Sequence, residues 1–178
     1  EKQPDIALVV VIDQSGSMSD PFGGGGGRRK ADGVADAINR LLQNLVIKCA
    51  KSEGVRDYYE VGVIGYGSGV GLAFGGALSG REMVPISEVA NSPARVEERT
   101  RTVADGTGGR VDQTVKFPVW FDATANGGTP MGQALGLAHQ LLQGWVGRHP
   151  SSYPPIVINI TDGEATDGDP TPQARALT

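Results

Sequence analysis

The chain has 178 residues, of which 39% are hydrophobic and 20% charged, and its formal net charge is −4. This length and composition are typical of one globular domain and exclude an intrinsically disordered chain. The small negative charge argues against a nucleic-acid-binding protein. The single cysteine, Cys49, excludes an internal disulfide and a cysteine-based zinc site. No run of about 18 apolar residues is present, so no membrane segment is expected.

The first regular element expected is a strand over residues 6–12, where aliphatic and β-branched residues follow one another almost without interruption. Such a run is typical of a strand buried on both faces of a helix-covered parallel sheet. The letters DQSGS come next, so Asp13, Ser15 and Ser17 leave the core at the carboxyl end of the strand, where α/β sheets bind ligands. Capping of a helix is the alternative for these residues, but the next helical pattern begins too far along the chain.

A run of glycines over residues 23–27 follows, and it is too flexible to form a regular element. Three basic residues come next: Arg28, Arg29 and Lys30. A phosphate-binding loop does not fit, because Lys30 follows an arginine and precedes an alanine. The basic residues are either a solvated loop or a rim that steers an acidic ligand toward the strand end.

Apolar residues at helical spacing predict a long amphipathic helix over residues 30–51. Cys49 falls on its apolar face, which favours a buried thiol. Residues 58–65 are expected to form the second strand, and a tight glycine turn leads into an antiparallel partner over residues 70–78. A short helix is expected over residues 85–90.

Residues 94–118 alternate polar residues with apolar residues or threonine on both sides of a glycine-rich centre. This pattern favours a solvent-facing β-hairpin inserted into the domain. A helix is the alternative, because Glu97 and Arg101 would then lie one turn apart and form an ion pair.

The rest of the chain predicts a helix that begins at Pro130, a buried strand over residues 156–160, and the start of another helix at residue 170. The alternation of strands and helices predicts a Rossmann-like, doubly wound α/β fold. Its sheet is expected to be mostly parallel, with one antiparallel strand and helices on both faces.

Right-handed crossovers place the ends of the strands at Ile12 and Ile160 on the same side of this sheet. Five oxygen-bearing residues are then expected to converge there: Asp13, Ser15, Ser17, Thr129 and Asp162. Three hydroxyls and two carboxylates, without histidine or cysteine, suit a hard cation such as Mg²⁺. A cation held largely by neutral hydroxyls stays electron-poor, so an open coordination position would accept a carboxylate from a partner. This donor set points to binding and not to hydrolysis.

These motifs resemble those of the von Willebrand factor A (vWA) domain family. The residues that carry the resemblance are DQSGS at 13–17, Thr129 in GGTP and Asp162 in ITDG, which together look like a metal-ion-dependent adhesion site (MIDAS). The resemblance implies a bound divalent cation, usually Mg²⁺ with Mn²⁺ or Ca²⁺ as alternatives. This cation would recognise an Asp or Glu of a partner protein.

The sequence around the motifs is most similar to that of bacterial, intracellular members, so a cytoplasmic bacterial protein is expected. Family members usually continue with two further strands and their helices. Residues 1–178 are therefore expected to form a single vWA-like domain that lacks its C-terminal strands.

We expect a binding domain and not an enzyme, with two alternatives. A magnesium-dependent phosphoryl-transfer enzyme commonly has a second carboxylate two residues after its aspartyl nucleophile, where this chain has Ser15. A scaffold with a vestigial metal site is the other. The acidic loop that begins at Glu164 lacks the spacing of a calcium-binding EF-hand. Glu164 and the three basic residues at 28–30 are therefore expected to border the partner-binding surface.

Overall fold

The computed structural model describes residues 6–22 and 27–178, so most of the predicted glycine loop lies outside the described residues. The central sheet has the strand order β5-β4-β1-β9, and β6 also pairs with β4. Its strands are β1 (Ile6–Asp13), β4 (Tyr59–Tyr66), β5 (Val70–Leu72), β6 (Val84–Pro85) and β9 (Ile156–Ile160). β1 is parallel to both β4 and β9, whereas β5 and β6 run antiparallel to β4. The predicted Rossmann-like, mostly parallel sheet is confirmed.

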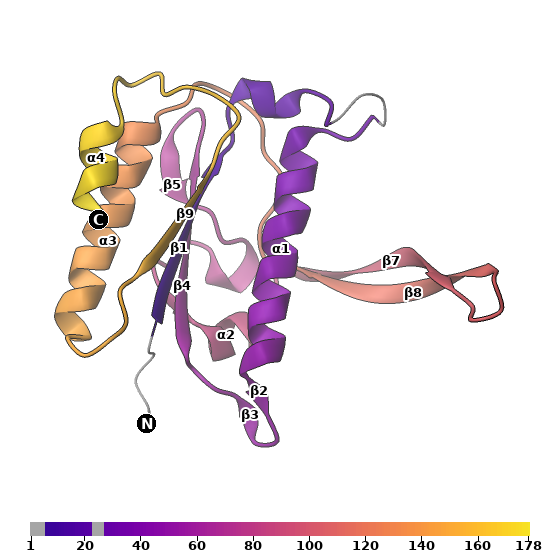
Figure 1. The fold of residues 1–178 in the computed structure, drawn as a ribbon. Helices are drawn as coiled ribbons and strands as arrows, with labels where there is room; N and C mark the ends of the chain where they lie inside the picture. Colours follow the sequence, from indigo (N-terminus) through magenta and orange to yellow (C-terminus); the bar gives the residue numbers. More distant parts are fainter. Residues whose placement is uncertain (1–5, 23–26) are drawn as a thin grey trace.

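Helices cover both faces of this sheet (Figure 1). The helices are α1 (Lys30–Cys49), α2 (Ile86–Asn91), α3 (Met131–Arg148) and α4 (Thr171–Ala176). α1 and α2 lie on one face, and α3 lies on the other with α4 beside it. The short elements are the 3₁₀ helices η1 (Gly16–Ser19) and η2 (Gly76–Leu78), and a ribbon of β2 (Ala50–Lys51) with β3 (Gly54–Val55).

β1 is the most deeply buried strand, and its side chains alternate between two hydrophobic clusters. Leu8, Val10 and Ile12 pack on the side of α1, while Val9 and Val11 pack on the side of α3. Burial of each aliphatic side chain stabilises the fold by about 1.5–3 kcal/mol. The strand therefore holds the polar residues that follow it in a fixed position. β9 lies at the edge beside β1, and the expectation that further strands continue the sheet there stays a prediction.

Three boundaries differ from the sequence prediction. A 3₁₀ helix follows β1 almost at once, over Gly16–Ser19, where no regular element was predicted. The strand predicted over 70–78 ends at Leu72, because Gly75 donates its N–H to the Trp120 carbonyl and the chain leaves β4. The first long helix ends at Cys49 and not at residue 51, because Ala50 pairs with Val55 in the β2–β3 ribbon.

The region around residues 94–118 is a hairpin of β7 (Arg95–Ala104) and β8 (Arg110–Val119), paired from Arg95 opposite Val119 to Ala104 opposite Arg110. The helical alternative is therefore wrong. The hairpin extends far from the body of the domain (Figure 1). Only its base is buried, at Phe117 and Val119. In the part of the chain that the structure describes, no helix is long and apolar enough to cross a membrane.

Candidate metal centre

Asp13 is held rigidly at the carboxyl end of β1. The parallel register of β1 and β9 places Ile12 beside Ile160, so Asp13 and Thr161 leave the sheet at adjacent positions. The Thr161 hydroxyl donates to Asp13 Oδ2 over 2.7 Å, and the Ser15 backbone N–H donates to Asp13 Oδ1 over 2.8 Å. Asp13 is only 1% exposed. Both oxygens of a buried carboxylate are therefore fixed in position.

The remaining polar side chains continue from Ser15 across to Asp162. The hydroxyl oxygens of Ser15 and Ser17 lie 3.1 Å apart, and the Ser17 hydroxyl donates to Asp162 Oδ1 over 2.8 Å. Asp162 Oδ2 accepts from the Lys30 ammonium over 2.7 Å. Four of the five residues predicted to converge are thus joined in one network, although 145 positions separate Ser17 from Asp162.

Thr129 lies in a loop that is hydrogen bonded to this network. Gly16 N–H donates to the Gly127 carbonyl over 3.0 Å, and Asn126 N–H donates to the Gln14 carbonyl over 2.7 Å. Thr129 itself is buried, and its N–H donates to the Thr166 hydroxyl over 2.9 Å. Within the described part of the chain, no hydrogen bond engages the Thr129 hydroxyl. That oxygen remains available as a ligand.

Two glycines allow the loops to pack this closely. Gly127 has a φ of +83°, and a Cβ there would lie 2.4 Å from the backbone nitrogen of Ser68. A Cβ on Gly67 would lie 2.6 Å from the carbonyl oxygens of Gln14 and Asn126. Larger residues would therefore force the loop that carries Thr129 away from the end of β1.

The electrostatics of the network favour charged Asp162. The hydrogen bond from Lys30, supported by the one from Ser17, holds the pKa of Asp162 below its usual value. The same hydrogen bond raises the pKa of Lys30. Beside Asp13 in the sheet, burial raises the pKa of Tyr66 to about 12. Its phenol therefore stays protonated at neutral pH and donates to Asn159 Oδ1 over 2.9 Å.

The family model of the von Willebrand factor type A domain matches residues 7–178. The chain belongs to this family. Comparison with curated proteins gave no match. The matched region includes every residue of the network, from Asp13 to Asp162. vWA domains commonly mediate protein interactions, which is the general function that membership of the family supports.

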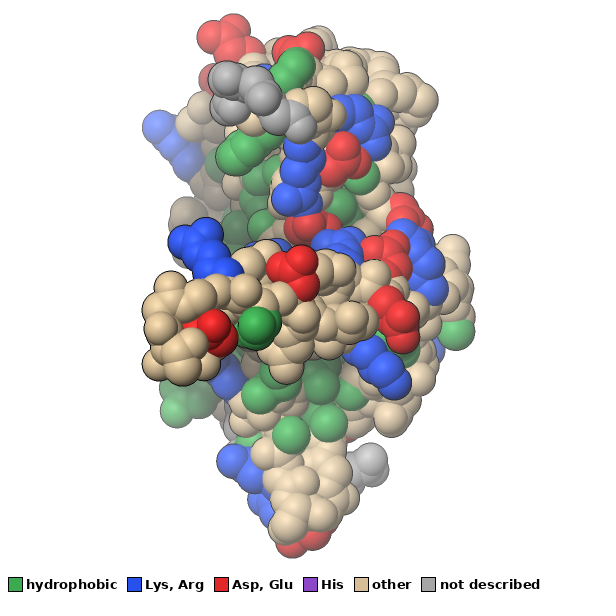
Figure 2. Space-filling view, turned by 90° about the vertical axis from the view of Figure 1, so that its right-hand side faces the viewer, with side chains coloured by type: hydrophobic (Ala, Val, Ile, Leu, Met, Phe, Trp, Pro, Cys, Tyr) green, Lys and Arg blue, Asp and Glu red, His purple; other side chains and the backbone are tan. Residues whose placement is uncertain are grey.

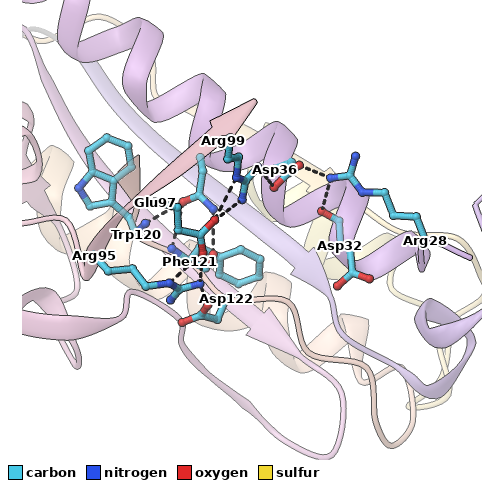
Figure 3. Close-up of polar contacts among 10 residues, drawn as sticks. Arg28, Asp32, Asp36, Arg95, Glu97, Arg99, Trp120, Phe121 and Asp122 are labelled. Carbon is cyan, nitrogen blue, oxygen red and sulfur yellow. Dashed lines mark hydrogen bonds and ion pairs between the residues drawn. The ribbon is translucent and has the colours of Figure 1, made fainter. Parts of the chain in front are cut away.

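The three basic residues at the start of α1 of this vWA domain do not act together. The Arg28 guanidinium pairs with Asp36, and Arg29 pairs with Asp32 over 2.8 Å, so both turn toward α1. Figure 3 shows Arg28 directed to Asp32 and Asp36, near the base of the hairpin. Only Lys30 contacts the candidate site. Glu164 is exposed and has no ion pair among the described residues.

Sequence reasoning missed two hydroxyls that shape the site. Thr161 fixes Asp13, and Thr166 fixes the backbone of Thr129. Thr161 directly precedes a predicted ligand, but its role depends on the register between β1 and β9, which the sequence alone does not state.

The donor set fits a hard divalent cation. It contains only oxygen: two carboxylates and three hydroxyls, of which Ser15 and Ser17 already lie side by side. Across residues 6–22 and 27–178, no group of three or more His, Cys, Asp or Glu side chains is placed to hold a metal ion. Soft metals that need thiolate or imidazole ligands do not fit this site, whereas Mg²⁺, Mn²⁺ and Ca²⁺ accept such oxygen ligands.

Proposed function

We propose that this vWA domain binds a divalent cation, in the first place Mg²⁺, and uses it to hold an acidic side chain of a partner protein. The proposed ligand set is that of a MIDAS: Asp13, Ser15, Ser17, Thr129 and Asp162. One observation carries the proposal. An unbroken hydrogen-bonded network runs from Thr161 through Asp13 and the two serines to Asp162.

The hydrogen-bond directions suit this role. Because the Ser17 O–H donates to Asp162 Oδ1, Ser17 Oγ can accept the Ser15 O–H and still keep one lone pair to face a cation. Asp13 is oriented by two donors, as metal-ligating carboxylates usually are. A bound cation would supply a positive centre, and an Asp or Glu of the partner would be its natural anionic ligand.

We propose binding and not catalysis as the task of this site. Both oxygens of Asp13 already accept hydrogen bonds, which suits a positioning group better than a nucleophile. A protein partner is also favoured over a nucleic acid. Figure 2 shows Lys and Arg side chains mixed with Asp and Glu around the hairpin, without the continuous basic stripe that a phosphate backbone requires. The similarity of the motifs to bacterial, intracellular members leads us to propose a bacterial cytoplasmic setting.

The proposal is tested by retention of partners on the immobilised domain in buffer with Mg²⁺ and with excess EDTA. Ser15→Ala removes one hydroxyl that, among the described residues, is hydrogen bonded only to Ser17, so the fold should persist. Ser151→Ala, in an exposed loop, is the matched control. We expect Ser151→Ala to retain the partner in Mg²⁺, and both EDTA and Ser15→Ala to release it. Partners that stay bound in EDTA and on Ser15→Ala would contradict the proposal.

Two assays separate the alternatives. Turnover of p-nitrophenyl phosphate with Mg²⁺ that is lost on Asp13→Asn would favour a phosphoryl-transfer enzyme. A calorimetric titration with MgCl₂ that gives no heat and no thermal shift would favour a scaffold with a vestigial site.

A further inference from the structure

We propose that Lys30 is a tethered cation that competes with the divalent cation for Asp162 and so weakens cation binding at this site. This inference rests on the proposed function, because it concerns the same site.

The contact between the two side chains is direct. Lys30 Nζ lies 2.7 Å from Asp162 Oδ2 and 3.8 Å from Asp20 Oδ2. The Lys30 and Asp162 side chains are 31% and 16% exposed, so solvent screens their interaction only in part. The other oxygen of Asp162 accepts from Ser17. The carboxylate is therefore shared between a proposed metal ligand and a fixed positive charge.

The position of Lys30 is not explained by the helix to which it belongs. Lys30 is the first residue of α1, where the helix dipole disfavours a cation. The preceding Arg28 and Arg29 pair with Asp36 and Asp32 of α1 itself. Lys30 instead reaches Asp162, which is 132 positions away in the sequence. Its backbone N–H also donates to the Asp20 carbonyl over 2.9 Å, which ties the start of α1 to the chain after η1.

A divalent cation that is coordinated by Asp162 would therefore lie within a few ångströms of the Lys30 ammonium group. Coulomb repulsion between a divalent cation and an ammonium this close lowers the affinity for the cation even at the dielectric constant of water, and it rises as the surroundings become less polar. Removal of the ammonium should accordingly tighten Mg²⁺ binding by about tenfold. Because salt screens partly exposed charges, the gain should shrink at high ionic strength.

The experiment is an isothermal titration with MgCl₂ of five proteins: wild type, Lys30→Met, Lys30→Gln, Lys30→Arg and Lys51→Met. Lys30→Met removes the charge and nearly keeps the length of the side chain, and Lys30→Gln serves as a second neutral variant. Lys30→Arg keeps the charge, and Lys51→Met removes an exposed lysine from the β2–β3 ribbon. We expect about tenfold tighter binding only for the neutral Lys30 variants, with a smaller difference in 0.5 M KCl.

The outcomes separate this inference from the function on which it rests. If wild type binds Mg²⁺ and the neutral Lys30 variants bind with equal or lower affinity, Lys30 merely orients Asp162 and the inference is wrong. If none of the five proteins binds Mg²⁺, the proposed function fails and the inference fails with it. Binding by the neutral variants alone would show that the Lys30 ammonium prevents Mg²⁺ binding in the wild type, and would support the inference.

Discussion

Two threonine–aspartate hydrogen bonds of the same length illustrate how differently two regions of this vWA domain are built. The Thr161 hydroxyl donates to Asp13 over 2.7 Å, and the Thr102 hydroxyl donates to Asp112 over 2.7 Å. The first bond orients a buried carboxylate at the end of β1, whereas the second joins exposed residues of the β7–β8 hairpin. Because an unsatisfied group costs free energy only when water cannot replace its partner, burial and not length decides what each bond contributes.

Both regions depend on α1, at different positions along it. Lys30, at its first residue, contacts the candidate metal centre. Further along, the amide oxygen of Asn39 accepts from the N–H groups of Trp120 and Phe121, and its amide nitrogen donates to the Phe121 carbonyl. Asp36 pairs with Arg99 over 2.8 Å (Figure 3). The hairpin is thus fixed at its base and free at its tip.

The largest expected effect is on the buried clamp at the base of the hairpin. Asn39 is 2% exposed, and Asn39→Leu would leave two N–H groups and one carbonyl without a partner. We expect a loss of about 4 kcal/mol in the free energy of unfolding, measured with urea. The same change at exposed Asn44 of α1 should cost no more than about 0.5 kcal/mol. Equal losses of unfolding free energy for the two variants would show that the buried hydrogen bonds of Asn39 do not stabilise the base of the hairpin.

The second prediction compares the two threonines directly. Thr161→Val removes the donor to Asp13 Oδ2, so the Mg²⁺ affinity measured by calorimetry should fall by about tenfold, as for other groups that orient metal ligands. Thr102→Val removes an equally short bond on the hairpin and should leave that affinity unchanged. A fall in affinity for Thr102→Val, or none for Thr161→Val, would contradict the distinction between the regions.

The smallest expected effect concerns the ion pair between hairpin and α1. Arg99 contacts Asp36 and Glu97, and its guanidinium lies 3.7 Å from the centroid of the Phe117 ring. Arg99→Met should lower the free energy of unfolding by about 1 kcal/mol. Arg101→Met, two residues along the same exposed hairpin, should have no measurable effect. Unfolding of the two variants at the same urea concentration would contradict the predicted difference between Arg99 and Arg101.

Local patterns predicted the elements that bury continuous apolar sequence. The strand over 6–12 follows from its continuous apolar run, because its side chains are buried on both faces of the sheet, and the helix that begins at residue 30 follows from its apolar periodicity, because it covers one face. The convergence of Asp13 and Asp162 also followed, because parallel strands end on the same side.

The features that could not be predicted depend on contacts between distant segments. β5 ends early because Gly75 donates a hydrogen bond to the Trp120 carbonyl, and Arg28 turns away from the predicted rim because it pairs with Asp36, nearly two helical turns into α1. The role of Thr161 needs the register of β1 against β9. None of these contacts produces a periodic pattern of residues in the sequence.

The central claim is that the polar side chains at the ends of β1 and β9 form a divalent-cation site. Its most direct test is anomalous diffraction from crystals of the domain grown with MnCl₂. The account predicts one strong anomalous peak bordered by the hydroxyls of Ser15, Ser17 and Thr129. Crystals that show no peak there, or a peak only at the acidic loop after Gly163, would contradict it.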